Sequence, residues 1–547
     1  MQKTEPNLAL TPDYYLDNFL KLHQHATEWY SDLLSAQEQR WLDAFSQLSH
    51  ASQCLLVRML SRKGHWFRSD KLSYAEIGEL QHPLSQLSQF EFIRVNPSIS
   101  RADLAQSLLT KPELLTLDSS LDKRMTKQQA IEQFSEGTDI EHTESLALDF
   151  QIIELLHPRT IDVLLLLFFA NTHQDLSQFV LTDIGLHRFE AYDLSKERRF
   201  FKSRDHIEQR LILSELYANY QLTEKRSLAL IELLEQLPEK GPFKDVNRRR
   251  EQIINLIARD LERLGEVDQA LKWFQQSTLP PSRERQARML EPLNQLDMMQ
   301  AIISDMRSNP KDIGEWEVAG KLQARLDRKR GLKVTRSQKP KHATLHLDDL
   351  DLSQTRVELA VLNHLTQDGW RCFYSENTLL NGLFGLLFWE VIFAPVEGAF
   401  INPYQHRPLD LYHSDFVTKR EAMIQHALDT LETLSHQAWV DRYHHKYGIS
   451  NPFVNWNLFS EDLLIEAITY IPTSTLRGLF EILLTDLARY RSGMPDLIAF
   501  KDGQYQWVEV KGPGDKVQDN QWRWFRHFEQ LGVPFSVCYV NQGAKSQ

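Results

Sequence analysis

Hydrophobic and polar positions follow a helical period over most of the chain. Residues 13–62 place large apolar side chains three and four positions apart and contain neither Gly nor Pro, a pattern typical of amphipathic helices. Residues 145–330 continue in the same way. Strand-like runs become dense only after residue 345, at 369–375, 495–500, 504–510 and 533–540. The pattern predicts a multidomain protein that is mostly α-helical over its N-terminal two-thirds, with a C-terminal α/β domain that contains a mixed sheet.

Two helical segments have more specific outlines. In SRADLAQSLLTKPEL, residues 100–114, Ser100 is a predicted N-cap with Asp103 at the capping-box position, and the segment resembles a SAP-type DNA-binding module. Ala258, Gly265, Ala270 and Phe274 have TPR-like spacing, which also fits any close helical hairpin. These outlines predict four domains: a helical domain at 1–70, a SAP-like module at 71–140, a TPR-like helical domain at 141–340 that ends in a basic linker, and a final domain at 345–547.

Composition narrows the class of protein. A chain of 547 residues with 42% hydrophobic and 25% charged residues is an ordinary folded protein. Its three cysteines lie too far apart for a paired zinc site, and they favour a reducing compartment such as the cytoplasm. The longest apolar run, 163–170, is far shorter than the ~20 residues that cross a bilayer, and residues 1–6 lack the charge pattern of a signal peptide. We expect no membrane association.

Local charge matters more than the net charge of -12. Residues 321–341 hold nine basic residues and one acid, and a second basic group surrounds Phe200 and Phe201. The segment RKGHWFR, at 62–68, mixes cations with aromatic rings, as a surface that meets phosphates and bases would; a solvated loop with its rings turned inward fits equally well. The candidate DNA-binding residues are Arg62, Lys63, Arg68, Arg198, Arg199, Lys202, Arg204, Arg328, Lys329, Arg330, Arg489 and Arg491.

The most specific chemistry lies in GMPDLIAFKDGQYQWVEVK, residues 493–511. Asp502-Gly503 is a preferred pair for a two-residue β-turn between strands, and this turn places Ile498 opposite Trp507 and Asp496 opposite Glu509. Opposed side chains share one sheet face with Cβ atoms ~5 Å apart, so two carboxylates there repel each other unless a cation lies between them. Lys511 follows on the same face. The spacing predicts a metal site; an exposed hairpin with a surface Glu–Lys pair is the alternative.

These residues resemble a known nuclease family. Met494-Pro495-Asp496 followed by Glu509-Val510-Lys511 is similar to the PD-(D/E)XK core, and EVKGPGDKVQDNQ at 509–521 resembles its VRR-NUC branch. Together with SENTLLNGLFGLLFWEVIF at 375–393, RPLDL at 407–411 and the SAP-like and TPR-like segments, the whole chain resembles the bacterial Fanconi-associated nucleases. The resemblance covers most of the chain, and 375–411 and 491–521 are its most specific parts.

The resemblance implies a structure-selective, divalent-metal-dependent DNA endonuclease and 5′-to-3′ exonuclease. It would act near 5′ flaps and branched DNA in interstrand crosslink repair, in the bacterial cytosol and at the nucleoid when bound to DNA. Asp496, Glu509 and Lys511 would be catalytic, with Glu376, Asp496, Glu509 and the Val510 carbonyl holding Mg²⁺ or Mn²⁺. Gln521 matches a position that faces the same pocket. A second copy of the chain is a candidate partner on the same substrate.

Several alternatives stay open at this point. Glu376 also suits the first turn of a helix predicted over 376–393, where the helix dipole favours an acid without any function. Arg489 and Arg491 could hold a phosphate next to the cleaved one or could simply be solvated. Another PD-(D/E)XK activity, such as junction resolution, would normally come in a much shorter chain. A non-catalytic DNA-binding scaffold is disfavoured by the presence of Asp496, Glu509 and Lys511.

Overall fold

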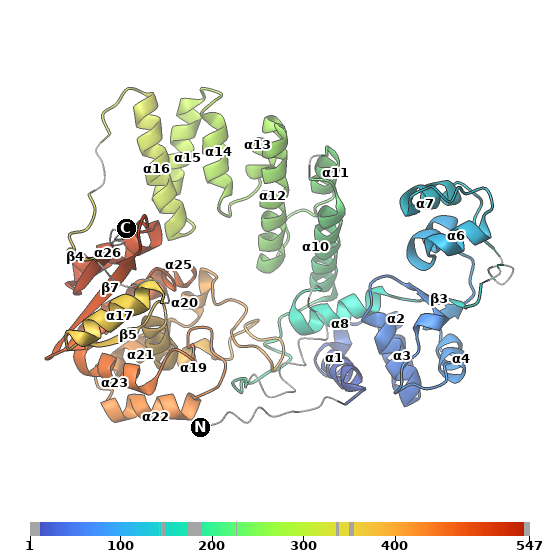
Figure 1. Cartoon of the computed structure of the whole chain (residues 1–547), viewed down its shortest axis with the longest axis horizontal. Helices are drawn as coiled ribbons and strands as arrows, with labels where there is room; N and C mark the ends of the chain where they lie inside the picture. The colour runs from blue at the N-terminus through green and yellow to red at the C-terminus, as the bar shows by residue number, and fades with distance from the viewer. Residues whose placement is uncertain are drawn as a thin grey trace, which may run out of the picture. The chain divides into compact units, whose positions relative to one another are not determined.

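The computed structural model describes residues 11–141, 143, 146, 148–172, 174, 188–225, 227–334, 338–348 and 355–540. The chain divides into two compact units, one formed by residues 1–186 and 201–214 and the other by residues 187–200 and 215–547. Its elements are shown in Figure 1. Among the described residues, no helix is long and apolar enough to span a membrane.

The first unit is mostly helical. Its helices are α1 (Tyr14–Tyr30), α2 (Ala36–Ser46), α3 (His50–Leu60), α4 (Gln81–Gln89), α5 (Arg101–Asp103), α6 (Lys111–Leu117), α7 (Lys127–Ser135) and α8 (Arg159–Phe169). The predicted cap at Ser100 is present, because its side chain accepts a hydrogen bond from the Asp103 amide. The helix α10 (Arg204–Leu222) begins in this unit and ends in the other.

A small sheet in the first unit corrects the expectation that strands begin only after residue 345. Strands β1 (Trp66–Arg68), β2 (Ile93–Val95) and β3 (Ile152–Leu155) form it in the order β1-β3-β2, with antiparallel pairing throughout. Runs of three or four residues are too short to display an alternating pattern. The segment 62–68 therefore ends in a strand rather than in a loop.

The second unit starts with a layer of helices in which each packs on the next (Figure 1). They are α11 (Ala229–Glu235), α12 (Lys244–Leu264), α13 (Val267–Phe274), α14 (Ser282–Leu290), α15 (Leu296–Ser308) and α16 (Ile313–Lys329). Gly265 ends α12 with a φ of 96°, so the predicted turn of the hairpin is present. The first part of the basic stretch is helical, because residues 321–329 continue α16, and its last turn gains from Arg328 and Lys329 at the negative end of the helix dipole.

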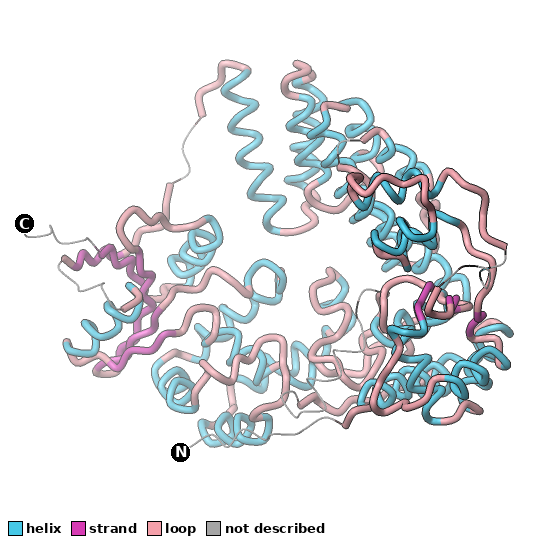
Figure 2. Tube along the Cα trace, turned by 45° about the vertical axis from the view of Figure 1, so that its right-hand side comes forward, coloured by secondary structure: helices cyan, strands magenta, loops and turns pink. Residues whose placement is uncertain are grey.

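The C-terminal part of the second unit is the expected α/β domain with a mixed sheet. Figure 2 shows its strands gathered together: β4 (Ala343–Leu347), β5 (Arg371–Tyr374), β6 (Leu497–Lys501), β7 (Gln504–Lys511) and β8 (Phe535–Val540). Their order is β4-β8-β7-β6-β5, parallel over the first three strands and antiparallel over the last three. The edge strand β4 was not predicted, since three of its five residues are exposed.

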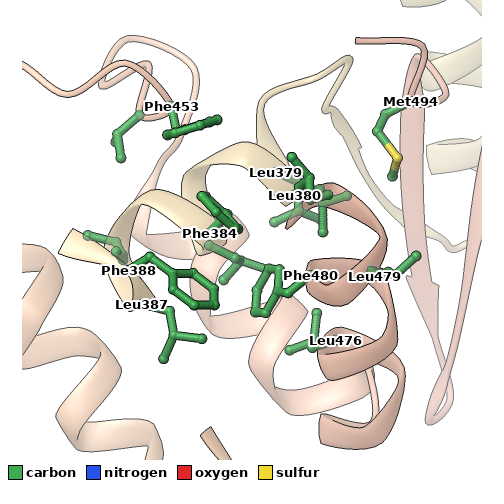
Figure 3. Close-up of a cluster of buried hydrophobic side chains, with 14 of the residues drawn as sticks. Leu379, Leu380, Phe384, Leu387, Phe388, Phe453, Leu476, Leu479, Phe480 and Met494 are labelled. Atoms are coloured by element: carbon green, nitrogen blue, oxygen red, sulfur yellow. The ribbon is translucent and has the colours of Figure 1, made fainter. Parts of the chain in front are cut away.

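Helices surround this sheet and fill a long insertion between β5 and β6. They are α17 (Val357–Gln367), α18 (Leu379–Leu387), α19 (Trp389–Ile392), α20 (Asp415–Lys419), α21 (Glu421–Leu431), α22 (His436–Lys446), α23 (Glu461–Tyr470), α24 (Thr473–Thr485), α25 (Leu487–Tyr490) and α26 (Asp519–Leu531). In the core, Phe384 of α18 and Phe388, which directly follows α18, stack at 4.4 Å and contact Phe480 of α24 (Figure 3). Burial of these rings fixes α18 and α24 beside the sheet.

The close packing of α18 generates a stability prediction. A Cβ added at Gly382 would lie 2.8 Å from ring atoms of the buried Phe459, so Gly382→Ala should lower the free energy of unfolding by ~1–3 kcal/mol through overpacking. Gly320 in α16 is exposed, with nothing within 4 Å of the same position. Gly320→Ala should therefore raise stability by ~0.5–1 kcal/mol through helix propensity. Thermal unfolding of both variants checks this; a Gly382→Ala protein that melts above the wild type contradicts the packing.

Candidate nuclease site

The site is built on the β6–β7 hairpin, whose register is the one predicted. Leu497 pairs with Val508, Ile498 with Trp507 and Lys501 with Gln504. Asp502 and Gly503 have φ values of 48° and 78°, as a two-residue turn with both central residues left-handed requires. Asp496 directly precedes this ladder, and its Oδ2 accepts a hydrogen bond from the Val510 amide at 2.8 Å. The hairpin therefore brings Asp496 to the strand that carries Glu509.

Glu509 is fully buried on β7. Its Oε1 accepts hydrogen bonds from Lys511 Nζ at 2.7 Å and from Gln521 Nε2 at 2.5 Å. Its Oε2 has no hydrogen-bond partner within the described part of the chain. A buried carboxylate oxygen without a donor is costly, and a cation is the kind of group that would satisfy it.

The two acids also perturb each other. Burial is the main reason that the pKa of Glu509 rises to about 8, and the charge of Asp496 adds to this rise. The pKa of Asp496 rises to about 6, again through burial first. The Val510 amide and Lys511 oppose that rise, whereas the charges of Glu376 and Glu358 reinforce it. A cation bound here would relieve the mutual repulsion of these carboxylates.

A tight backbone approach positions Asp496. Gly493 has a φ of 96°, and a Cβ at this position would lie 2.8 Å from the backbone of Asn520 near the start of α26. Only glycine fits such a contact in the left-handed region. Met494 is buried, and its sulfur-containing side chain belongs to the same hydrophobic cluster as Phe384 and Phe480 (Figure 3). Backbone geometry on one side and core packing on the other thus fix the turn that leads into Asp496.

Glu376 lies in a turn, which corrects the helix predicted over 376–393. The helix α18 starts only at Leu379, because Asn377 has a left-handed φ of 51° and interrupts helical geometry. The amides of Ser375 and Glu376 donate to the Asp496 carbonyl at 2.8 and 3.1 Å. The Glu376 carboxylate accepts hydrogen bonds from the Tyr374 hydroxyl and, at 3.2 Å, from the Asn377 amide. Glu376 is therefore tied to the Asp496 segment through the backbone.

The donor set fits a hard divalent cation. Asp496 and Glu509 supply carboxylate oxygens, and the Oε2 atom of Glu509 is available for a ligand; Mg²⁺ and Mn²⁺ prefer such oxygens. Throughout the described residues, no three His, Cys, Asp or Glu side chains already stand in a metal-holding group. The structure thus brings Asp496 and Glu509 together, whereas the Glu376 carboxylate is hydrogen-bonded to the Tyr374 hydroxyl. Its role as a ligand stays a prediction, as does that of the Val510 carbonyl.

Gln521, which the resemblance placed near the site, donates from its Nε2 atom to Glu509 Oε1 at 2.5 Å. It is the third residue of α26, and its Oε1 accepts from the Gln518 amide at 2.7 Å in a capping box. The same side chain therefore stabilises the start of α26 and holds one oxygen of Glu509. Helix geometry fixes this amide, so Glu509 keeps one orientation.

The candidate DNA-binding residues differ in how far their charges are already paired. Carboxylates pair with Arg68, Arg204, Arg330 and Arg489. Arg62 donates to the Lys71 carbonyl, and Arg199 is half-buried. The others are exposed: Lys63, Arg198, Lys202, Arg328, Lys329 and Arg491. Their contact with DNA stays a prediction.

Some neighbours of the site escaped the sequence reasoning. Tyr374 and Asn377 lie close to Glu376 in the chain and donate hydrogen bonds to its carboxylate. Their position next to Glu376 in the sequence could have indicated that they contact it. Arg407 and Arg491 lie 5.0 and 4.9 Å from the centre of the Tyr412 ring. Arg407 begins the RPLDL segment, but nothing in the pattern indicated that it would approach the same tyrosine ring as Arg491.

Comparison with known proteins identifies the families that this chain resembles. The family model "VRR-NUC domain" matches residues 431–542, and the model "FAN1, HTH domain" matches residues 13–94. The Fanconi-associated nuclease 1 homolog of Pseudomonas aeruginosa is 36% identical over 97% of this chain and 96% of its own length. Fanconi-associated nuclease 1 of Homo sapiens is 24% identical over 98% of this chain and 63% of its own length.

Solved structures give the same result. A crystal structure of paFAN1 bound to 5′-flap DNA with a gap and a 2-nt flap is similar, with a TM-score of 0.87 and 36% identity. The match covers 98% of this chain and 100% of that one. A second structure, of paFAN1 with a 1-nt 5′ flap, has a TM-score of 0.85 and 35% identity over 98% and 100% of the two chains.

The electrostatics of the site generate a pH prediction. The pKa of Asp496 is about 6 in the folded protein, against 3.8 ordinarily, so without metal its ionisation costs stability as the pH rises from about 4 through 6. In EDTA at pH 8, Asp496→Asn should therefore raise the free energy of unfolding by ~1 kcal/mol or more, since one pKa unit corresponds to ~1.4 kcal/mol. The advantage should vanish near pH 4.

The matched control is Asp502→Asn on the same hairpin, because Asn-Gly suits the same turn. Thermal unfolding of the three proteins between pH 4 and 8 is the measurement. Parallel pH profiles for the wild type and Asp496→Asn would show that the Asp496 charge is not destabilising.

Proposed function

Because the chain belongs to the Fanconi-associated nuclease 1 family and is a divalent-metal-dependent DNA nuclease, we propose that it cleaves phosphodiester bonds near 5′ flaps and branches in DNA. The observation that carries the proposal is the fully buried Glu509 beside the half-buried Asp496, with one Glu509 oxygen that has no partner among the described residues and Lys511 at 2.7 Å from the other. The flap preference rests on the similarity to paFAN1, which was crystallised with 5′-flap DNA.

The finer parts of the proposal follow the resemblance of the whole chain. The metal is Mg²⁺ or Mn²⁺, the activity includes 5′-to-3′ exonuclease as well as endonuclease cleavage, and the biological role is interstrand crosslink repair. The protein works in the bacterial cytoplasm, associated with the nucleoid when it is bound to DNA, and a second protomer is a candidate partner on one substrate. The two homologues and two DNA complexes described above support the nuclease class and the binding of flap DNA, and the finer parts rest on the resemblance to the family.

The protein supplies binding and orientation for the reaction. Asp496 and Glu509 would hold the metal, with Glu376 and the Val510 carbonyl as additional ligands. The chemistry supplied by the bound ion is a lower pKa for water and neutralisation of phosphate charge. Gln521 keeps Glu509 in one orientation through its 2.5 Å hydrogen bond. Glu509 is buried and Asp496 is half-buried, so their charges act at a lower dielectric than in water, where charges interact more strongly.

Lys511 acts on the scissile phosphate and the attacking water. Its ammonium is buried and held by Glu509, so its position beside the ligands is fixed before substrate arrives. There it orients the attacking water and stabilises negative charge that develops on the phosphate. The water oxygen forms a bond to phosphorus as the bond to the 3′ oxygen breaks. The attacking water gives up a proton to the solvent and the 3′ oxygen takes one up, which leaves a 3′-hydroxyl and a 5′-phosphate.

Arg491 and Arg407 offer a place for a neighbouring phosphate. Both are exposed, both approach the Tyr412 ring, and neither has a carboxylate partner among the described residues. Arg491 also donates to the Tyr412 hydroxyl at 3.2 Å. Two unneutralised guanidinium groups near the catalytic turn suit phosphate oxygens. Arg489 differs, since Asp312 pairs with it at 2.7 Å.

A cleavage panel tests the proposed activity. Purified protein with Mn²⁺ or Mg²⁺ should cut a labelled 5′-flap duplex faster than a linear duplex, and EDTA should stop the reaction. Asp496→Asn should be inactive, and Lys511→Ala should lose at least ~100-fold in kcat, because an oriented charge at the phosphate is removed. Lys501→Ala is the control, since Lys501 lies on the same hairpin and donates to the Asp368 carbonyl.

The outcomes separate the candidate functions. Equal cleavage by all variants and in EDTA would reject the metal mechanism. Tight flap binding without any cleavage would favour a non-catalytic scaffold. Faster cutting of a four-way junction than of a flap would favour a junction resolvase.

The two arginines before the catalytic turn generate a binding prediction. Arg491→Ala should weaken flap binding and reduce the slope of log affinity against log salt by ~1, as expected for one lost phosphate contact. Arg489→Ala should leave that slope unchanged and lower the melting temperature, because Asp312 loses its partner. Fluorescence anisotropy in 50–200 mM salt with EDTA measures the slopes. Equal slopes for the wild type and Arg491→Ala would remove Arg491 from the DNA contact.

A further inference from the structure

The residues around Glu376 form a network that the cleavage mechanism does not use. Tyr374 at the end of β5 donates its hydroxyl to Glu376 Oε2, and Asn377 donates its amide to Glu376 Oε1 at 3.2 Å. Both oxygens of one carboxylate are thus held by neutral donors from its own turn. A carboxylate oxygen accepts about two hydrogen bonds or ligands, so each keeps a lone pair for a cation.

Asn377 also reaches the catalytic turn. Its Oδ1 accepts a hydrogen bond from the Met494 amide at 3.1 Å, while its Nδ2 donates to Glu376. One planar amide therefore sets the distance between the Glu376 carboxylate and the turn into Asp496. Only one orientation of this amide satisfies both partners, because an amide oxygen cannot donate and an amide nitrogen cannot accept.

The backbone of Asn377 is held in place as well. Its left-handed φ of 51° is a conformation that Asn adopts more readily than most residues. Asn381 of α18 donates to the Asn377 carbonyl at 2.6 Å and to the Arg491 carbonyl at 2.8 Å. Two asparagines therefore connect the turn at 375–378 to the segment at 491–496, in parallel with the two amides that donate to the Asp496 carbonyl.

We propose that Tyr374 and Asn377 are positioning residues that hold Glu376 as a third carboxylate ligand at a fixed distance from Asp496. The inference rests on the proposed metal-dependent nuclease activity. The Glu376 side chain is exposed, and its charge raises the pKa of Asp496, so without partners the carboxylate would be free to turn away from Asp496. The two donors restrict it to the turn that is hydrogen-bonded to the Asp496 carbonyl, where it could serve as a ligand when a cation binds. Partners of ligands in this role typically contribute ~10- to 100-fold to metal affinity.

Isothermal titration of the full chain with Mn²⁺ tests the inference. Tyr374→Phe keeps the ring and loses only the hydroxyl, and Asn377→Gly tolerates the left-handed backbone and loses only the side chain. Each should weaken Mn²⁺ binding by ~10-fold, and the Mn²⁺ concentration for half-maximal flap cleavage should rise in step. Asn294→Gly is the matched control, because Asn294 is an exposed residue with a φ of 56° between α14 and α15; its Mn²⁺ affinity should equal that of the wild type.

A double-mutant cycle separates positioning from general damage. With Glu376→Gln already present, Tyr374→Phe should change Mn²⁺ affinity by less than ~2-fold, because it acts only through the carboxylate that is gone. Asn377→Gly should lose less affinity in this background than in the wild type, since only its hydrogen bond to the Met494 amide is left to lose. Three outcomes would overturn the inference: equal losses in both backgrounds, single variants that bind Mn²⁺ like the wild type, or a Glu376→Gln protein with unchanged affinity. In each case, flap cleavage by the wild type would still support the proposed nuclease activity. If the wild type neither binds Mn²⁺ nor cleaves, the proposed function itself fails. Should Asn377→Gly fail to fold, the Tyr374→Phe cycle alone decides.

Discussion

A carboxylate taken out of water needs a compensating charge or donor, and at Glu509 this need is near its maximum because the side chain is fully buried beside Asp496. Lys511 and Gln521 satisfy one oxygen and leave the other without a partner in the described residues. The surrounding C-terminal domain can be understood as the framework that sustains this arrangement. The hairpin fixes which residues meet, Gly493 lets α26 approach, and α26 in turn supplies Gln521.

The helical layer supports the same arrangement from outside the sheet. Glu317 of α16 forms ion pairs with Arg523 and Arg526 of α26, and Asp312 at the start of α16 pairs with Arg489. Arg523 also donates to the Arg489 carbonyl, and the Trp524 indole donates to the carbonyls of Tyr490 and Ser492. Displacement of α16 would therefore shift α26, and through α26 the side chains of Gln521 and Glu509. The last helix of the layer thus contributes to the stability of the nuclease domain.

The sequence predicted the features that depend on interactions between residues close together in the chain. The Asp502-Gly503 turn determines the register of β6 and β7, so the meeting of Asp496 and Glu509 followed from local chemistry alone. The start of α18 could not be predicted in this way. Asn377 has a left-handed backbone, and the amides of residues 375 and 376 donate to the Asp496 carbonyl, which lies about 120 positions further along the chain. The strands β1 to β3 were missed for a related reason. Each is too short to show a period, and only pairing across up to 88 positions of chain makes them strands.

The ionic state of the site follows from the balance between burial and pairing. Lys511 offsets only part of the negative charge, since the pKa values of both Asp496 and Glu509 remain raised in its presence. Stronger pairing, for example by a second lysine, would make the folded chain more stable without metal and would also remove the reason to bind one. Incomplete neutralisation is thus what a metal-dependent site requires. The same reasoning explains why neutral donors, Tyr374 and Asn377, hold Glu376 where an arginine would have formed a stronger but competing ion pair.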